Sequence, residues 1–139
     1  MVGRDYLTLA REIFSGGSER HWRGALGRAY YALMLECRDL LARWGFVPAP
    51  RENVHTFVRL RFVFAADPDA ILIGRRLDWY CGLRNRADYD LSTHTAFSSD
   101  STARKAINDV TDALTRLDAL SIDAARVASI IADMRSRWP

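Results

Sequence analysis

The sequence predicts an all-α protein, folded as an up-and-down bundle of five to six helices. Apolar residues recur at spacings of three and four along most of the chain, as they do on one face of an α-helix. No segment alternates between apolar and polar residues over a useful length, and neither Asn-Gly nor Asp-Gly, the usual hairpin turns, occurs. A chain of 139 residues has the size of one domain and buries roughly 70% of its unfolded surface. We therefore expect residues 1–139 to form a single domain.

Two helices are predicted in the first third of the chain, at residues 5–14 and 19–44. Glycines at residues 16–17 separate them, and Ser18 stands at the N-cap of the second helix. The second helix carries an apolar stripe at alternating spacings of four and three, formed by Leu26, Tyr30, Leu33, Cys37, Leu40 and Trp44. Such a stripe is typical of bundle helices, and Gly45 ends this one.

A proline-containing loop leads to a third predicted helix, which Asn53 caps and which runs to Ala66. Residues 67–69, Asp-Pro-Asp, then break the chain and cap a fourth helix at residues 69–90. Because the second and fourth helices are the longest, we expect them to pack against each other.

A polar segment, residues 92–101, precedes a fifth predicted helix that begins at Ser101 or Thr102 and reaches Leu117. Ser121 is the predicted N-cap of the last helix. The apolar face of that last helix is formed by Ala125, Val127, Ile130, Ile131 and Met134.

The fourth predicted helix places an arginine where its stripe should be apolar. The stripe consists of Ile73, Leu77, Tyr80, Arg84, Ala87 and Leu91. An unpaired buried cation costs several kcal/mol, so Arg84 needs a carboxylate partner, a cavity or interface, or an anionic ligand such as phosphate. Asp88, one helical turn on, is the nearest candidate partner, and Glu36 on the second helix is another.

Arginine dominates the basic residues of the chain. Of 20 basic residues, 19 are arginine and only Lys105 is lysine, although the formal net charge is just +3. The arginine side chain matches phosphate geometry, which favours a nucleic-acid or nucleotide partner. A genome rich in G and C explains the same bias, and both interpretations stay open. Arg84 and Arg86, together with the pairs at residues 59 and 61 and at residues 75–76, could form a basic surface for RNA.

Neither a metal site nor a membrane segment is expected. Cys37 and Cys81 lie inside predicted helices without the paired Cys or His spacings of a zinc site, so we expect reduced, buried thiols and no cofactor. No apolar run approaches the roughly 18 residues that span a bilayer, and residues 1–11 lack the apolar core of a signal peptide. The expected location is the cytoplasm.

Three passages of the chain, in this order, resemble the HEPN superfamily (higher eukaryotes and prokaryotes nucleotide-binding), and in particular its small stand-alone prokaryotic members. They are residues 27–34 in the second helix, His55 with Phe57 and Phe62 in the third, and residues 84–91 in the fourth. The resemblance implies a helical bundle that commonly forms a homodimer and is often encoded beside a minimal nucleotidyltransferase, as a toxin–antitoxin-like module of two genes.

Many members of that superfamily are metal-independent ribonucleases, whose motif is an arginine followed, after four to six residues, by a histidine. In that chemistry the histidine moves the proton of the RNA 2′-hydroxyl and the arginine neutralises the phosphate. None of the three histidines here follows an arginine at that spacing, and the fifth position after Arg84 is Tyr89, a poor base at neutral pH. His55, which the helix dipole keeps neutral, is the candidate to supply the missing base.

The resemblance also suggests roles for the residues near Arg84. Arg84 would contact phosphate and Asp88 would fix its rotamer. Tyr89 would stack, donate a hydrogen bond, or accept AMP from the nucleotidyltransferase, although the tyrosine modified in the family falls at the position of Leu91. Tyr31 points about 100° away from the preceding tyrosine, so one of the two can face the core and the other a partner, but we expect both to pack within the bundle.

Three functions therefore remain open. The first is a nucleotide- or RNA-binding component of a two-gene module. The second is a metal-independent ribonuclease toxin whose site uses Arg84 and His55 in place of the usual motif. The third is a purely structural helical bundle that serves as an interaction module.

Overall fold

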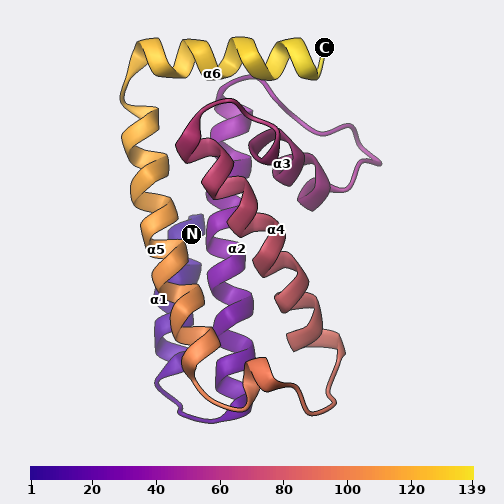
Figure 1. The fold of residues 1–139 in the computed structure, drawn as a ribbon, viewed down its shortest axis with the longest axis vertical. Helices are drawn as coiled ribbons and strands as arrows, with labels where there is room; N and C mark the ends of the chain where they lie inside the picture. Colours follow the sequence, from indigo (N-terminus) through magenta and orange to yellow (C-terminus); the bar gives the residue numbers. More distant parts are fainter.

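The computed structural model describes all residues from Met1 to Pro139 and contains six α-helices, one short 3₁₀ helix and no strand (Figure 1). This confirms the all-α fold class. The elements are α1 (Gly3–Phe14), α2 (Glu19–Arg43), α3 (Val54–Val63), α4 (Pro68–Tyr89), η1 (Thr95–Phe97), α5 (Ser101–Ser121) and α6 (Ala124–Arg137).

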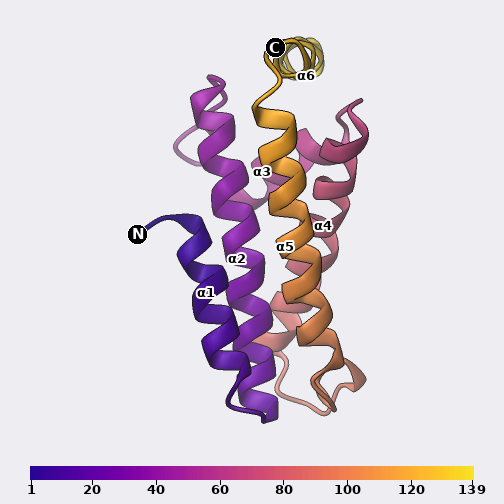
Figure 2. The same cartoon turned by 90° about the vertical axis from the view of Figure 1, so that its left-hand side faces the viewer.

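Four helices, α1, α2, α4 and α5, run along the long axis and alternate in direction, as the sequence predicts for an up-and-down bundle (Figures 1 and 2). The long helix α2 packs against α1, α3, α4 and α5, so the expected contact between α2 and α4 is present. The short α3 lies against α4, and α6 crosses one end of the bundle (Figure 1).

The apolar stripes identified in the sequence mostly form the core. In α2 every stripe residue except Trp44 is buried, with Leu26, Leu33 and Cys37 fully enclosed. In α4 the last residue of the predicted stripe is not part of the helix. Leu91 lies beyond the end of α4 and is 81% exposed, contrary to its predicted place on the buried face. In α6 only Ile130 and Met134 are buried.

The helix ends follow local side-chain chemistry. Asn53 accepts a hydrogen bond from the backbone N–H of Thr56 at 3.0 Å and caps α3, as predicted. Asp67 caps α4 by accepting from the N–H groups of Asp69 and Ala70, both at 3.0 Å. Gly45 ends α2 with a φ of 91°, a left-handed conformation that glycine adopts without steric cost.

Two predicted boundaries are wrong. The third helix ends at Val63 and not at Ala66. Ser121 does not cap α6, because it is the last residue of α5 and its hydroxyl donates to the carbonyl of Leu117. The N-cap of α6 is Asp123, whose carboxylate accepts from the N–H of Arg126 at 3.1 Å.

Helix α6 is attached to the bundle by ion pairs as well as by its two buried residues. The guanidinium of Arg126 contacts both carboxylate oxygens of Asp67, at 2.6 and 2.9 Å, and one of Asp69 at 2.6 Å. These contacts lower the pKa of Asp67 and of Asp69 from the ordinary value. The cap of α4 and the attachment of α6 therefore depend on the same carboxylate.

Backbone packing is closest where α3 meets α4. A Cβ atom added at Gly74 would lie 2.3 Å from the backbone nitrogen of Val63 and 2.5 Å from the carbonyl carbon of Phe62. No side chain fits into that gap, so glycine is what lets the two helices cross here.

None of the six helices combines the length and the apolar character that a membrane span requires. Both cysteines are free, as expected, but only Cys37 is buried; Cys81 is partly exposed. No three His, Cys, Asp or Glu side chains converge as metal ligands.

Candidate functional site

Arg84 lies on the side of α4 that faces α2, and its side chain is only 15% exposed. Its Nη2 donates to the hydroxyl oxygen of Tyr31 at 2.5 Å, and its Nη1 donates to Oδ1 of Asn85 at 3.2 Å. Its Nε lies 3.0 Å from Oδ2 of Asp88, although the N–H is not aimed well enough for a hydrogen bond. The expected partnership with Asp88 is thus present as an ion pair one helical turn apart.

The alternative partner, Glu36, does not reach Arg84. It pairs instead with Arg4, at 3.7 Å, and accepts from the backbone N–H of the same residue at 3.1 Å. Gly27 lies opposite the arginine, because a Cβ there would be 3.8 Å from Cγ of Arg84 and from Oδ1 of Asp88. Two passages that the sequence singled out, residues 27–34 and residues 84–91, therefore meet across the α2–α4 contact.

Aromatic rings surround the guanidinium. Its central carbon lies 4.9 Å from the ring centre of Tyr31 and 6.0 Å from that of Tyr89. Tyr31 in turn packs against Tyr6 at 6.1 Å. Tyr89 is 76% exposed, so an aromatic residue borders the arginine on its solvent side.

The neighbouring tyrosines of α2 both pack within the bundle, with 5.8 Å between their ring centres, but they are buried to different extents. Tyr30 is 2% exposed and belongs to the core, whereas the partly exposed Tyr31 reaches Arg84. Burial, together with the thiol of Cys81, raises the pKa of Tyr30 above its ordinary value, so its hydroxyl stays protonated at neutral pH.

His55, from the first turn of α3, joins the same cluster. Its Nδ1 lies 2.7 Å from the hydroxyl oxygen of Tyr30, and the two rings stack at 5.7 Å between centres with an interplanar angle of 14°. The ring of Tyr31 is 6.0 Å away. Burial and the positive charge of Arg84 lower the pKa of His55 from 6.5, so the imidazole is neutral at neutral pH.

The hydrogen on the imidazole decides what His55 can do. When Tyr30 donates its hydroxyl proton to Nδ1, the ring proton sits on Nε2, which then acts as a donor. When Nδ1 carries the proton and donates to the Tyr30 oxygen, Nε2 is a free base. Arg84, Tyr31 and His55, from three helices, together offer a cation, aromatic surface and a neutral imidazole.

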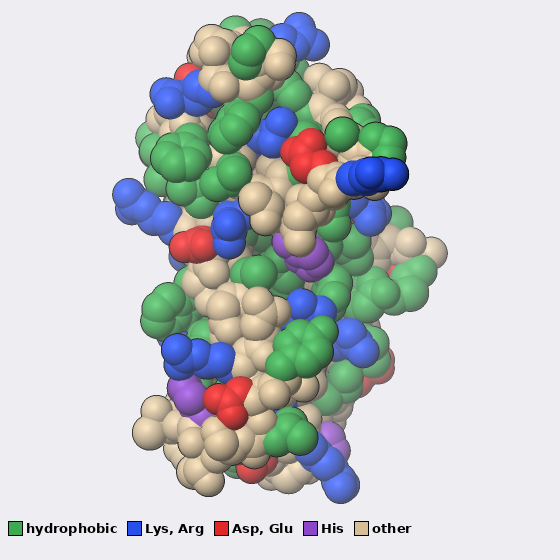
Figure 3. All heavy atoms as spheres, turned by 90° about the vertical axis from the view of Figure 1, so that its right-hand side faces the viewer, with side chains coloured by type: hydrophobic (Ala, Val, Ile, Leu, Met, Phe, Trp, Pro, Cys, Tyr) green, Lys and Arg blue, Asp and Glu red, His purple; other side chains and the backbone are tan.

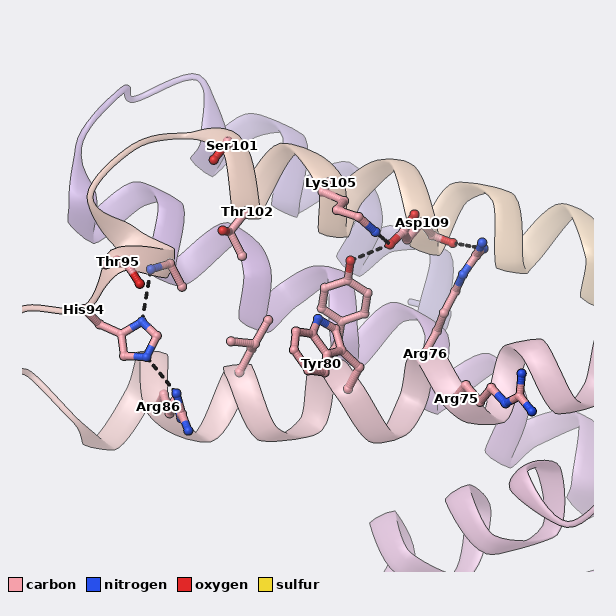
Figure 4. A pocket seen from close by; sticks show the side chains of 13 residues that line it. Arg75, Arg76, Tyr80, Arg86, His94, Thr95, Ser101, Thr102, Lys105 and Asp109 are labelled. Atoms are coloured by element: carbon pink, nitrogen blue, oxygen red, sulfur yellow. Dashed lines mark hydrogen bonds and ion pairs between the residues drawn. The ribbon is translucent and has the colours of Figure 1, made fainter.

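Arg86 does not belong to this cluster. It points away from Arg84 toward a cleft of about 800 Å³ between α4 and the start of α5, where its Nη1 lies 2.7 Å from Nε2 of His94 (Figure 4). Arg75 and Arg76 line the same cleft. The single basic surface expected from Arg84 and Arg86 is therefore divided between two sides of α4. Figure 3 shows the side formed by α3 and α4, where basic side chains lie among hydrophobic ones and acidic side chains are fewer.

Arg23 is the most buried charged residue of the chain, at 8% exposure, and is not among the residues that the sequence pointed to. Its guanidinium donates to the backbone carbonyls of Arg86, Ala87, Asp90 and Ser92, pairs with Glu19 at 3.1 Å and stacks on Phe97 at 4.5 Å. A signal was present, since Arg23 lies three residues before Leu26 and continues the apolar stripe of α2. It is the same signal that singled out Arg84.

Comparisons of the chain with protein-family models, with curated proteins and with solved structures give no match.

Proposed function

We propose that this chain is a HEPN-type helical bundle that binds RNA or nucleotide at Arg84 and acts as one component of a two-gene module with a minimal nucleotidyltransferase. The observation that supports this most is the convergence of Arg84, Tyr31 and His55 from α4, α2 and α3. A cation that is held in place beside aromatic rings is what phosphate and an unstacked base require.

The contacts of Arg84 leave capacity for a ligand. Arginine has five N–H donors. One hydrogen on each Nη atom is used by Tyr31 and Asn85, and Nε faces Asp88, so one hydrogen on each Nη atom remains. A phosphate oxygen can accept from both. The exposed ring of Tyr89 lies on the same side and offers a stacking surface for a base.

Binding of a fluorescently labelled single-stranded oligoadenylate, followed by anisotropy, tests this proposal. We expect Arg84→Gln to weaken binding roughly tenfold, which corresponds to about 1.4 kcal/mol, and Arg84→Lys to restore only part of it because lysine lacks the planar fork. Arg51→Gln is the matched control, since Arg51 is exposed in the α2–α3 loop. Equal affinity of Arg84→Gln and the wild type, with the helical content intact, contradicts the proposal.

The proposed partner and the proposed homodimer have separate tests. Co-expression with a minimal nucleotidyltransferase from the same genome, followed by mass spectrometry, should show an AMP adduct on Tyr89 that is lost in Tyr89→Phe. An unmodified Tyr89 removes that role. Sedimentation analysis should give twice the mass of one chain, and a monomer at all concentrations contradicts the dimer.

The position of His55 favours a second candidate function, a metal-independent ribonuclease. In the tautomer with a free Nε2, His55 accepts the 2′-hydroxyl proton, the 2′-oxygen attacks phosphorus and Arg84 neutralises the charge on the phosphoryl oxygens. The 5′-oxygen leaves with a proton from water, giving a 2′,3′-cyclic phosphate and a 5′-hydroxyl end.

This second function predicts RNA cleavage in the presence of EDTA. Arg84→Ala and His55→Gln should abolish it, whereas His94→Gln should keep it because His94 lies in the other cleft. Undiminished cleavage in both Arg84→Ala and His55→Gln excludes this site. If Arg84→Leu also leaves stability and RNA binding unchanged, the arginine serves packing alone and the chain is a structural module.

A further inference from the structure

The cleft between α4 and the start of α5 is separate from the Arg84 cluster. Trp79 and Arg86 contribute to it from α4, His94 and Thr95 from η1 and the residue before it, and Ser101 and Thr102 from the first turn of α5. Figure 4 shows Arg86 and His94 pointing toward each other at one end of the cleft, and Lys105, Tyr80 and Arg76 gathered near Asp109 at the other.

The charges of the cleft are not balanced. Asp109 is its one lining carboxylate, and that carboxylate accepts from Lys105 and from the hydroxyl of Tyr80, both at 2.5 Å. Arg76 pairs with Asp112 outside the lining. Arg75 and Arg86 have no carboxylate within ion-pair distance, so the cleft carries positive charge that the protein does not neutralise.

The contact between Arg86 and His94 has more donors than acceptors. Nδ1 of His94 caps η1 by accepting from the backbone N–H of Ala96 at 3.0 Å. A neutral imidazole has a single acceptor nitrogen, so it cannot accept from both Ala96 and Arg86, and in the tautomer that caps η1 the ring proton lies on Nε2. Nε2–H then faces an N–H of Arg86 across 2.7 Å, and two donors at that distance repel each other. An anion placed at their junction accepts from both and removes the conflict.

The first turn of α5 adds further donors at this end. The backbone N–H groups of Thr102 and Ala103 make no hydrogen bond within the protein, as is usual for a helix start, where the dipole also favours negative charge. Hydroxyl groups of Ser101 and Thr102 lie in the lining.

A large aromatic ring lies along the same wall. Trp79 is 65% exposed although it borders a cleft, which is unusual for tryptophan. It lies seven residues before Arg86, two turns earlier on the same face of α4 and roughly 10 Å away along the helix axis at 1.5 Å per residue. Both side chains line the cleft, so one ligand can contact both.

We propose that this cleft binds a phosphate monoester that carries a flat aromatic group, in the form of a nucleoside 5′-monophosphate. Arg86 and His94 hold the phosphate and Trp79 stacks on the ring. This site is separate from the proposed site at Arg84, because Arg84, Tyr31 and His55 are not among the residues that line the cleft.

Isothermal titration calorimetry with 5′-AMP, adenosine and inorganic phosphate tests the site. We expect AMP to bind more tightly than either fragment, and we expect Arg86→Gln and Trp79→Ala each to weaken AMP binding roughly tenfold. Both residues are exposed, so the variants should keep the wild-type helical content and melting temperature. Absence of saturable AMP binding to the wild type, or unchanged binding in both variants, overturns the proposal.

Two controls separate this site from the proposed function at Arg84. Arg51→Gln should bind AMP like the wild type, and Arg86→Gln should bind the labelled oligoadenylate like the wild type. Loss of AMP binding in Arg84→Gln but not in Arg86→Gln overturns the proposal that AMP binds in the cleft, and assigns the nucleotide to the Arg84 cluster. The proposal for the cleft and the proposal for Arg84 can therefore be contradicted independently of each other.

A separate experiment distinguishes two sources of the monophosphate, a free mononucleotide and the 5′ end of an RNA chain. A 5′-phosphorylated trinucleotide that displaces AMP, while its 5′-hydroxyl counterpart does not, identifies the end of an RNA chain as the ligand. Displacement by neither trinucleotide identifies a free mononucleotide. Both outcomes support phosphate and ring recognition in the cleft, whereas equal displacement by the two trinucleotides removes the role of the terminal phosphate and contradicts it.

Discussion

The Nη1 atom of Arg23, on α2, donates a hydrogen bond of 2.6 Å to the backbone carbonyl of Asp90, directly after the last residue of α4. The same atom lies 3.2 Å from the carbonyl oxygens of Arg86 and Ala87. One buried side chain thereby satisfies carbonyls that the end of a helix leaves without partners. It also fixes the start of the segment that leads to His94.

Removing that guanidinium should destabilise the protein strongly. We expect Arg23→Ala to lower the free energy of unfolding by about 3 kcal/mol, because buried carbonyls lose their donor and Glu19 loses its partner. Arg23→Lys should recover only part of this, since one ammonium cannot reach both the carbonyls that Nη1 binds and the acceptors that Nε and Nη2 bind. Urea denaturation at neutral pH measures both values, and a loss below 1 kcal/mol in Arg23→Ala contradicts the assignment.

Two glycines of α4 should respond in opposite directions to alanine. Gly74→Ala forces a Cβ into the backbone of α3, and we expect a loss of roughly 2 kcal/mol or more. Gly82→Ala meets no atom within 4 Å and should gain about 0.5–1 kcal/mol, because alanine loses less backbone freedom in a helix. Thermal and urea unfolding of the pair gives the comparison, and equal effects of both substitutions rule out the close crossing.

The lowered pKa of His55 predicts a pH-dependent stability. Below pH 6.5 the unfolded chain binds a proton at this histidine that the folded chain excludes by burial and by the charge of Arg84. Unfolding is therefore favoured as the pH falls through 6.5 toward the folded-state pKa, and stability rises again with pH. His55→Gln should flatten the difference in unfolding free energy between pH 7 and pH 5.5. The wild type and His55→Gln share the other two histidines, so these cannot cause a difference between the two proteins. If the unfolding free energy depends on pH in the same way in both, the burial of His55 is contradicted.

Asp67 offers a test that separates helix capping from ion pairing. Asp67→Ala removes both the cap of α4 and the contacts with Arg126, and we expect it to cost about 2 kcal/mol. Asp67→Asn keeps a good capping side chain, so it should cost roughly half as much. Identical losses in the two variants show that the ion pair with Arg126 accounts for the whole effect.

Periodicity and capping residues in the sequence predict most of this fold. Asn53 and Asp67 cap helices where the sequence places them, because a short polar side chain before an apolar periodic segment has few other uses. Ser121 misled the prediction because serine also donates to a carbonyl four residues back and so continues a helix. Asp123, two residues later, offered the same capping chemistry.

The site was only partly predictable from sequence. The pairing of Arg84 with Asp88 follows from helical spacing alone. The approach of His55 to Arg84 depends on how α3 crosses α4, which spacing along the chain does not determine. Two residues apart on a helix, Arg84 and Arg86 are rotated by about 200° about its axis, so they point to opposite sides. The prediction of one shared basic surface did not take this rotation into account.

The exposed position of Trp79 beside a cleft also could not be predicted from the sequence. Tryptophan in an amphipathic helix usually anchors a contact between helices. Trp79 is instead 65% exposed, because it lies outside the stripe formed by Leu77 and Tyr80. Its place beside a cleft depends on the course of η1 and α5, which no local pattern determines.

The crossing at Gly74 also offers a way to recognise relatives of this chain. A surface residue such as Tyr89 can change whenever a ligand changes, but a chain that keeps this crossing of α3 and α4 has no substitute for glycine at position 74. The combination of that glycine, an Asp-Pro start to the helix six residues earlier and an arginine ten residues later forms a sequence signature within α4. Such a signature can be searched for where overall similarity has faded.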